Sequence, residues 1–444
     1  MKRFFSLNFP FAFLIFIFVY LLQCIYINLW GVNVPFWDQW DAEAKLYISF
    51  LDHSLDLDGL IASHNEHRIA ITRLWSLLVF NLRGGWDPKF GMYAQAIIQS
   101  VNASILFLLL NPVKKGLLYK FSSLIAIVAV FGLPYYEENI LWSFQNQFYW
   151  MQFFGILSFY LYTGRDTKLK FIAIAFVNFC TLFTVASGIL SILVSISITF
   201  FFIFIKKKQS ILWKILFGFQ LFLLFLGKLL WVSVSEHGML KARDLSDLMN
   251  AYLQILNWPN GIINLILYSS FLYYFLIHKR ILTRITFIPM FYLGKYQFII
   301  LALLGWVLLQ IFAVAYGRAN GDVVSSRYLI TYSIAFPILI YFISNGLDKD
   351  FKKIKLIGFI SSFLVLYTLG SYSIKTSLPD IKKDNADLIR WNESLKEAYL
   401  KDDMQVLIKT KNKLHPRPKR IWKVIKDPVL KPYHLWKEGW DTID

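Results

Sequence analysis

Long runs of apolar residues recur along most of this chain. Phe11 to Trp30, Phe90 to Leu110 and Phe298 to Tyr316 each lack any acid or base. A helix needs about 20 such residues to cross the ~30 Å hydrocarbon core of a bilayer. Because lipid cannot satisfy backbone hydrogen bonds, the runs are predicted to be transmembrane helices.

The same pattern predicts an all-α polytopic membrane protein with about eleven transmembrane helices. The stretch 171–205 is too long for one helix and is interrupted at Ala186-Ser187-Gly188, so two short helices with a tight reversal are expected. The first run is longer than a signal-peptide core and no small-residue cleavage site follows it, so it is interpreted as a retained span. The predicted spans are 10–30, 90–110, 119–134, 148–163, 171–186, 189–205, 211–233, 261–277, 298–316, 329–343 and 355–374.

Composition agrees with this class of protein. Apolar residues make up 57% of the chain and charged residues 17%, against about 45–50% and about 25% in soluble domains. Both cysteines, Cys24 and Cys180, fall inside predicted spans. A disulfide framework or a cysteine-based metal site is therefore not expected.

The net charge of +18 follows the topology of the chain rather than a nucleic-acid surface. With the N-terminus in the cytoplasm, the inner segments carry 20 bases and three acids, whereas the outer loops carry nine bases and 14 acids. Basic residues mark cytoplasmic loops, so this bias predicts the orientation. Loops 31–89, 135–147, 234–260 and 317–328 would then open on the outer face.

Two regions are expected. Residues 1–374 form the transmembrane domain, with 31–89 as its long first outer loop carrying interfacial helices. Residues 375–444 form a polar, Lys-rich tail punctuated by prolines, predicted as a small appendage at the outer membrane surface. The high number of bases in this tail runs against the positive-inside rule.

Acids crowd the chain directly after the first span, where Asp38, Asp41 and Glu43 stand among aromatic residues. A helix starting near Asp38 would point Asp38 and Asp41 the same way. A carboxylate in a half-apolar site can have a raised pKa, as general acid–base catalysis requires. The alternative is a capped helix 39–52, with Asp38 as the N-cap and Asp41 in the first turn.

A second polar cluster, Ser63-His64-Asn65-Glu66-His67-Arg68, lies further along this loop. Catalysis, or recognition of a hydroxyl-rich or phosphate group, suits these side chains. A divalent metal is an alternative that the spacing supports poorly, because it differs from His-Glu-x-x-His. A solvated start of the helix 69–82 is the structural alternative.

The other outer loops add Glu138, Gln145, Arg318, Arg327 and Tyr328. Arg318 and Arg327 flank a glycine-containing turn between two spans. Their guanidinium groups would suit a lipid-linked phosphate at headgroup depth, because arginine binds phosphate oxygens through two parallel hydrogen bonds. Anchoring of the span ends to anionic headgroups is the alternative.

The inside N-terminus, the span layout and the acidic motif after the first span resemble the GT-C superfamily of membrane glycosyltransferases, which use polyprenyl-phosphate sugars. Segments 138–145 and 325–328 are similar to stretches in uncharacterised bacterial members. The resemblance implies an acceptor-activating carboxylate at Asp38 or Asp41, with Glu43 next in order. The acids read Asp-x-x-Asp here rather than the closer spacing that is commonest there.

Taken with the polar loops, the resemblance implies sugar transfer from a polyprenyl-phosphate donor to a glycan, lipid or protein hydroxyl on the periplasmic face of a bacterial inner membrane. A monophosphate donor carries its own leaving group, so no metal or other cofactor is required, and no nucleic-acid partner is expected. Alternatives are a surface-polysaccharide polymerase or ligase with a diphosphate-linked donor, and a lipid or oligosaccharide transporter. The substrate-binding candidates are Glu43, His64, Glu66, His67, Arg68, Glu138, Gln145, Arg318, Arg327 and Tyr328, with Asp38 and Asp41 as catalytic candidates.

Overall fold

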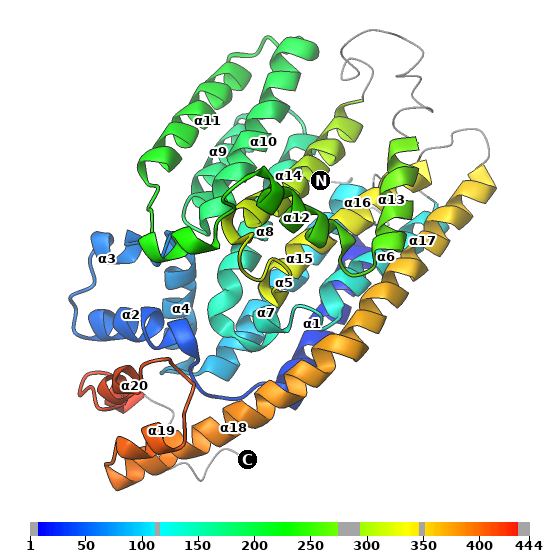
Figure 1. The fold of residues 1–444 in the computed structure, drawn as a ribbon. Coiled ribbons are helices and arrows are strands. Elements are labelled where there is room, and N and C mark those ends of the chain that lie inside the picture. Colours follow the sequence, from blue (N-terminus) through cyan, green and yellow to red (C-terminus); the bar gives the residue numbers. More distant parts are fainter. Residues whose placement is uncertain (1–7, 112–115, 274–293, 346–350, 434–444) are drawn as a thin grey trace.

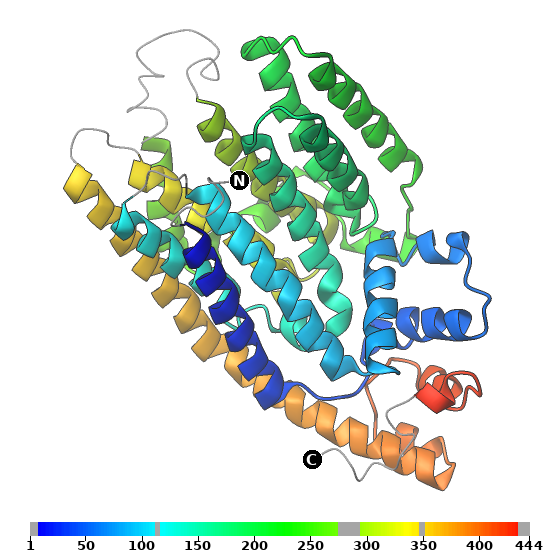
Figure 2. The ribbon, with the colours of Figure 1, turned by 180° about the vertical axis from the view of Figure 1, so that it is seen from behind.

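The computed structural model describes residues 8–111, 116–273, 294–345 and 351–433. Within these ranges the chain is helical and contains no strand. Figure 1 and Figure 2 show most of the long helices packed as a bundle with roughly aligned axes. The helices labelled α2, α3, α4, α19 and α20 lie at one end of it. The all-helical fold expected from the apolar runs is therefore confirmed.

Seven helical segments of the described residues are long and apolar enough to cross a membrane, which is the character of a multi-pass membrane protein. The other predicted spans coincide with shorter or more polar helices, so the count of about eleven crossings stays a prediction. The predicted span 261–277 ends outside the described residues. The seven segments are α1 (Asn8–Trp30), α5 (Pro88–Leu110), Ala186–Ile205 with α10 (Ile189–Phe200), α11 (Ile211–Leu229), α14 (Lys295–Arg318), Ser326–Ser344 with α15 (Ser326–Ser333) and α16 (Ala335–Asn345), and Leu356–Lys401. The shorter or more polar helices are α6 (Leu117–Gly132), α8 (Asn146–Thr163), α9 (Lys168–Thr181) and α13 (Gly261–Tyr273).

The predicted reversal near residue 186 is present. α9 ends at Thr181, a short turn follows, and the chain re-enters the bundle through a 3₁₀ turn at Ala186–Gly188. A Cβ on Gly188 would stand 2.2 Å from the carbonyl oxygen of Thr181. Only glycine allows the two helices to approach so closely at this point.

Polar side chains join the helices on one side of the bundle. Gln220 of α11 donates to Tyr162 of α8 at 2.7 Å and to Asn178 of α9 at 2.9 Å. Its own oxygen accepts from Thr199 of α10 at 2.8 Å. Between apolar helices in lipid, packing and such hydrogen bonds take over the role that hydrophobic burial has in water.

The short helices lie together at one end of the bundle, which we call the α2–α4 face. It carries α2 (Ala42–Leu51), α3 (Leu57–Ile61) and α4 (Ala70–Arg83) from the first loop. It also carries α7 (Glu137–Leu141), the 3₁₀ turn Ser235–Leu240 followed by α12 (Leu245–Asn257), and the connection between α14 and α15. Four loops predicted to open on one side of the membrane therefore meet.

The C-terminal segment forms part of this face rather than a separate appendage. α17 (Phe351–Tyr372) continues through a π-helical turn into α18 (Leu378–Lys401), which reaches past the end of α1 (Figure 2). The chain then returns through α19 (Gln405–Lys409) and α20 (Pro418–Ile425). We call residues 405–433 the C-terminal lobe.

A second hydrophobic core, outside the bundle, holds this lobe against the first loop. Trp40, Tyr47 and Trp86 from the first loop are buried with residues of α18 and the lobe. Burial of such large aromatic side chains contributes about 2–3 kcal/mol each. The boundary predicted at residue 375 therefore falls inside a continuous helix, and the tail shares its core with loop 31–89. The partners from α18 and the lobe are Trp391, Leu395, Ala398, Val406, Leu407, Leu414, Ile421, Val424, Ile425 and Leu430.

Candidate functional site

The polar cluster of the first loop adopts a tight turn instead of starting a helix. His64 and His67 exchange two backbone hydrogen bonds, of 2.7 and 3.0 Å, and Asn65 has a φ of +50°. α4 begins only at Ala70. The solvated helix start that the sequence left open is therefore wrong, because the reciprocal bonds close the chain on itself three residues earlier.

This turn presents the carboxylate of Glu66 to two cationic or polar partners from distant segments. Arg318 at the end of α14 donates from Nη2 to Glu66 Oε1 at 2.9 Å. His237 Nδ1 lies 2.5 Å from the other carboxylate oxygen. Glu66 thus connects the first loop to two further loops of the α2–α4 face.

Tyr328 links Arg318 to Arg327. Its hydroxyl accepts from Arg318 Nε at 3.4 Å, and the Arg327 guanidinium lies over its ring at 5.7 Å from the centroid. Arg327 Nε also contacts Glu138 Oε2 at 3.2 Å and Ser325 Oγ at 3.1 Å. Ser325 in turn donates to Glu138 Oε1 at 3.1 Å.

Asp38 lies beside His64 of the 64–67 turn. Its carboxylate lies 3.6 Å from His64 Nε2, interacts electrostatically with Arg327, and is 35% exposed. Within the described residues, no side chain or backbone group donates a hydrogen bond to it. Glu66, Arg318, Tyr328 and Arg327 are therefore joined by direct contacts, and His64, two residues before Glu66 in the same turn, brings Asp38 close to them; we call these six residues the polar ring.

A strained turn presents Asp38 to this ring. The preceding residue, Trp37, has a φ of +46°, which costs a bulky residue on the order of 1–3 kcal/mol. The backbone N–H of Phe36 donates to Gln39 Oε1 at 3.0 Å, and Gln39 Nε2 donates to Glu43 at 2.8 Å and Ser143 at 3.0 Å. Gln39 is 1% exposed, so buried hydrogen bonds hold the strained turn.

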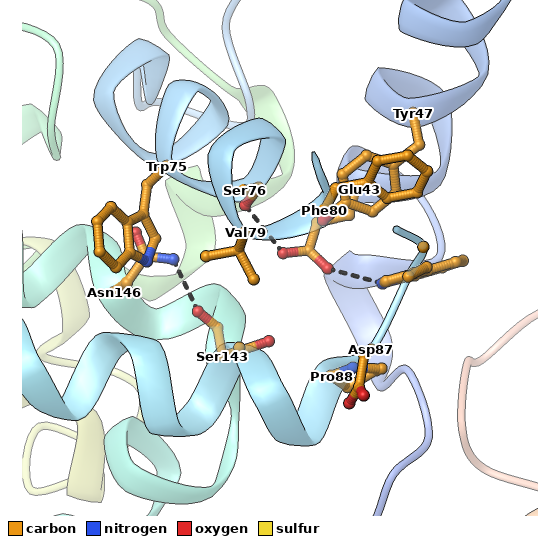
Figure 3. A pocket seen from close by; sticks show the side chains of 13 residues that line it. Glu43, Tyr47, Trp75, Ser76, Val79, Phe80, Asp87, Pro88, Ser143 and Asn146 are labelled. Atoms are coloured by element: carbon orange, nitrogen blue, oxygen red, sulfur yellow. Dashed lines mark hydrogen bonds between the residues drawn. The ribbon is translucent and has the colours of Figure 1, made fainter. Parts of the chain in front are cut away.

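Glu43 lies behind the ring, not in it. It is 5% exposed and accepts hydrogen bonds from Gln39, Ser76 and Trp86. Figure 3 shows its carboxylate inside a small pocket between α4 and the start of α5. Burial raises the pKa of Glu43, although the three donors oppose this rise. Its role here is to join α2 to α4 and to hold Gln39.

Asp38 and Asp41 do not share a face, contrary to the helical expectation. Residues Trp37–Gln39 form a 3₁₀ turn and α2 begins at Ala42, so neither carboxylate caps a helix that starts at residue 39. Asp41 contacts Arg420 at 2.8 Å and His415 at 2.9 Å, both from the C-terminal lobe. The Asp41 carboxylate therefore binds the C-terminal lobe.

Two further candidates lie outside the ring. Arg68 donates to the backbone carbonyl oxygens of Ile61 and Leu230, each at 3.0 Å, and so fastens the first loop to the end of α11. Gln145 is 1% exposed and its side-chain oxygen faces Gln147 at 3.5 Å. Within the described chain, neither side chain contacts a residue of the polar ring.

Sequence reasoning missed three residues that shape the site. His237 and Ser325 pair with Glu66 and Glu138, and Gln39 holds the turn that carries Asp38. His237 stands in a loop already predicted to open on the same face, but nothing in its spacing relates it to Glu66. Gln39 adjoins Asp38 in the sequence, and its burial becomes evident only from the fold.

The electrostatics of the 64–67 turn favour ionised Glu66 beside neutral His67. Burial alone would raise the pKa of Glu66, but His67, Arg318 and His237 lower it overall. Burial, together with His64, Arg318 and His237, lowers the pKa of His67 to about 4. His67 Nδ1 accepts the backbone N–H of Ala186 at 3.0 Å, so neutral His67 carries its proton on Nε2, which faces Glu66.

The ring can offer a free carboxylate and unpaired guanidinium edges to a ligand. Neither Nη atom of Arg327 has a hydrogen-bond partner among the residues described, and the side chain is 38% exposed. Across the described chain, no three His, Cys, Asp or Glu side chains have an arrangement that could hold a metal ion.

No protein-family model matches this chain, and neither a curated protein nor a solved structure matches it.

The protonation of His67 predicts a pH dependence of stability. The unfolded chain binds a proton at His67 near pH 6.5, the folded chain only near pH 4. The unfolded state therefore holds more protons between these values, and the free energy of unfolding should fall as pH drops from about 6.5 to 4. Glu66, whose pKa is lowered, adds a further loss only below about pH 4.5.

Thermal unfolding in detergent between pH 7 and 5 measures the contribution of His67. His67→Gln should flatten the decline, while His53→Gln, at an exposed position, should leave it unchanged. Equal slopes for wild type and His67→Gln would contradict the assignment.

Proposed function

We propose that this protein is a membrane glycosyltransferase of the GT-C type, which transfers a sugar from a polyprenyl-phosphate donor to an acceptor hydroxyl. The polar ring carries the proposal, because a solvent-accessible carboxylate from the first loop and two arginines that flank the α14–α15 connection converge at one end of an apolar bundle. A lipid-linked donor would bring its phosphate to this end and keep its chain in the bilayer.

Arg327 is the first candidate to bind the donor phosphate. Its Nε is held by Glu138 and Ser325, which orients the plane of the guanidinium. The two Nη groups can then bind phosphate oxygens side by side. Arg318, fixed by Glu66 and Tyr328, adds a second positive charge. Preorganised cations of this kind stabilise the charge that grows on a leaving phosphate.

Asp38 is the candidate general base. In the proposed step it takes the proton of the acceptor hydroxyl while the acceptor oxygen bonds to the anomeric carbon. The bond between that carbon and the phosphate oxygen breaks, and polyprenyl phosphate leaves with the electron pair. His64, 3.6 Å away, lies where a shorter contact with Asp38 could form once the acceptor is bound.

The distribution of charge supports an orientation for this reaction. Bases dominate the segments predicted to face the cytoplasm, and basic loops remain on that side during insertion. The α2–α4 face would then lie in the periplasm of a bacterial inner membrane, with the N-terminus in the cytoplasm. The product would belong to the assembly or modification of a cell-envelope glycan.

Replacing the proposed base tests the chemistry. Asp38→Asn keeps the size of the side chain but removes a useful proton acceptor, so turnover should fall about 10²–10⁴-fold with donor binding unchanged. Asp41→Asn is the matched control: it weakens the contacts with Arg420 and His415, so the melting temperature should fall and turnover should stay within a few-fold. Wild-type turnover in Asp38→Asn would refute the role of Asp38.

Replacing Arg327 tests donor binding. Lysine keeps the positive charge but loses the planar pair of Nη donors. Arg327→Lys should weaken binding of polyprenyl phosphate about tenfold, the value of roughly one hydrogen bond to a charged group. Arg83→Lys provides a control, because Arg83 pairs with Asp87 outside the ring. Unchanged affinity in Arg327→Lys would leave that residue as a structural partner of Glu138.

A further inference from the structure

The C-terminal lobe carries a dense positive charge that its own fold does not use. Residues 405–433 contain nine bases and a single acid, Asp427. Arg420 and Lys426 pair with Asp41 and Asp402, and Arg417 lies 3.5 Å from Asp41. The remaining six lysines are exposed and form no ion pair within the described chain; they are Lys409, Lys411, Lys413, Lys419, Lys423 and Lys431.

The fold of the lobe turns these lysines outward in a regular way. On α20, Ile421 and Ile425 are buried, whereas Lys419 and Lys423 stand one turn apart on the exposed side. Before α20, buried residues alternate with exposed lysines from Lys411 to Leu414. Because the buried apolar residues hold the lobe together, the exposed lysines are free to bind a partner.

The lobe stands away from the end of the bundle. Asn385 of α18 donates to the carbonyl oxygen of Trp30, the last residue of α1, at 2.8 Å. From Asn385 to Lys401, α18 continues for about 24 Å at 1.5 Å per residue. Figure 1 shows α19 and α20 at the far end of this helix. The lobe therefore extends beyond the end of α1, where its lysines can meet a partner from the aqueous phase.

The lobe is also continuous with the turn that carries Asp38. The backbone N–H of Trp37 donates to the carbonyl oxygen of Leu414 at 2.7 Å. Arg420 donates to the carbonyl oxygens of Trp40 and Asp41 at 3.1 and 3.3 Å. The Trp37 indole is 45% exposed beside this junction. A chain lying on the lysines could therefore reach both an aromatic surface and the Asp38 carboxylate.

We infer that the C-terminal lobe binds a polyanionic glycan, one that bears phosphate or carboxylate groups, and presents its hydroxyls to Asp38. This inference rests on the proposed function and names the acceptor class for the same site. Lysines are flexible point charges, which suit a repeating polyanion, whereas the planar arginines of the ring suit one phosphate. The exposed indole offers an apolar surface to a sugar ring.

Binding of phosphorylated dextran tests the inference without requiring transfer. The full chain in neutral detergent micelles is titrated against fluorescent phosphorylated dextran and against neutral dextran. K411Q/K413Q/K419Q/K423Q should weaken binding of the phosphorylated probe at least tenfold and reduce its salt dependence. A matched variant, K168Q/K206Q/K207Q/K214Q, removes four exposed lysines from the end of the bundle remote from the lobe and should bind within twofold of wild type. Neutral dextran should not bind.

Equal binding by wild type and the lobe variant would overturn the inference. Loss of binding in the matched variant alone would also overturn it. The same holds if single-stranded DNA or phosphatidylglycerol vesicles bind more tightly than phosphorylated dextran at equal charge. Asp38→Asn should bind phosphorylated dextran as wild type does. Binding through the lobe without any sugar transfer would refute the proposed enzyme and retain the lobe as a glycan-binding surface. Transfer to a polyanionic glycan at the same rate in wild type and in the lobe variant would support the proposed enzyme and refute the role of the lobe in acceptor binding.

Discussion

The contact between Glu66 and Arg318 joins the first loop to the end of α14, and the arrangement of the polar ring depends on it. Glu66 is held at the tip of a tight turn, and its second oxygen meets His237 from another loop. Such a partly buried carboxylate is stable in ionised form only while its cationic partners stay in place. Through Glu66, the first loop, the loop that carries His237 and the α14–α15 connection are held relative to one another. The same contact orients Arg318 toward Tyr328.

A second constraint acts on Asp38 through its neighbours. The positive φ of Trp37 is unfavourable, and the buried bonds of Gln39 to Phe36, Glu43 and Ser143 maintain it. On the other side, Asp41 and Trp37 are tied to the C-terminal lobe. Asp38 is thus the free carboxylate between two restrained neighbours. Strain supported in this way is common where a side chain must be held for function.

Much of the fold could be predicted from the sequence, because runs of apolar residues leave a chain few options in lipid. Charge bias grouped four loops on one face, and these loops meet in the structure. α18 was missed since its composition is polar, although Leu388, Trp391, Leu395 and Ala398 recur at helical spacing along its packed side. This apolar stripe, recognised in advance, would have predicted a helix docked on the first loop.

The sequence predicted which residues make up the candidate site better than it predicted how those residues are arranged in space. His64, Glu66, Arg318 and Arg327 stood out as polar or charged residues in an otherwise apolar chain. The different surroundings of Asp38 and Asp41 could not be derived from their spacing, because a 3₁₀ turn and a left-handed residue replace the expected helix. Likewise, Arg68 looked available until the fold supplied two backbone carbonyl groups for it.

The most direct test is an experimental structure of the full chain with a short-chain polyprenyl phosphate bound. The account predicts that the phosphate lies in the polar ring, with hydrogen bonds from the Nη groups of Arg327 and from Arg318, and with Asp38 across from it on the aqueous side. A phosphate bound elsewhere on the bundle, with Arg318 and Arg327 still paired only to Glu66 and Glu138, would contradict the central claim.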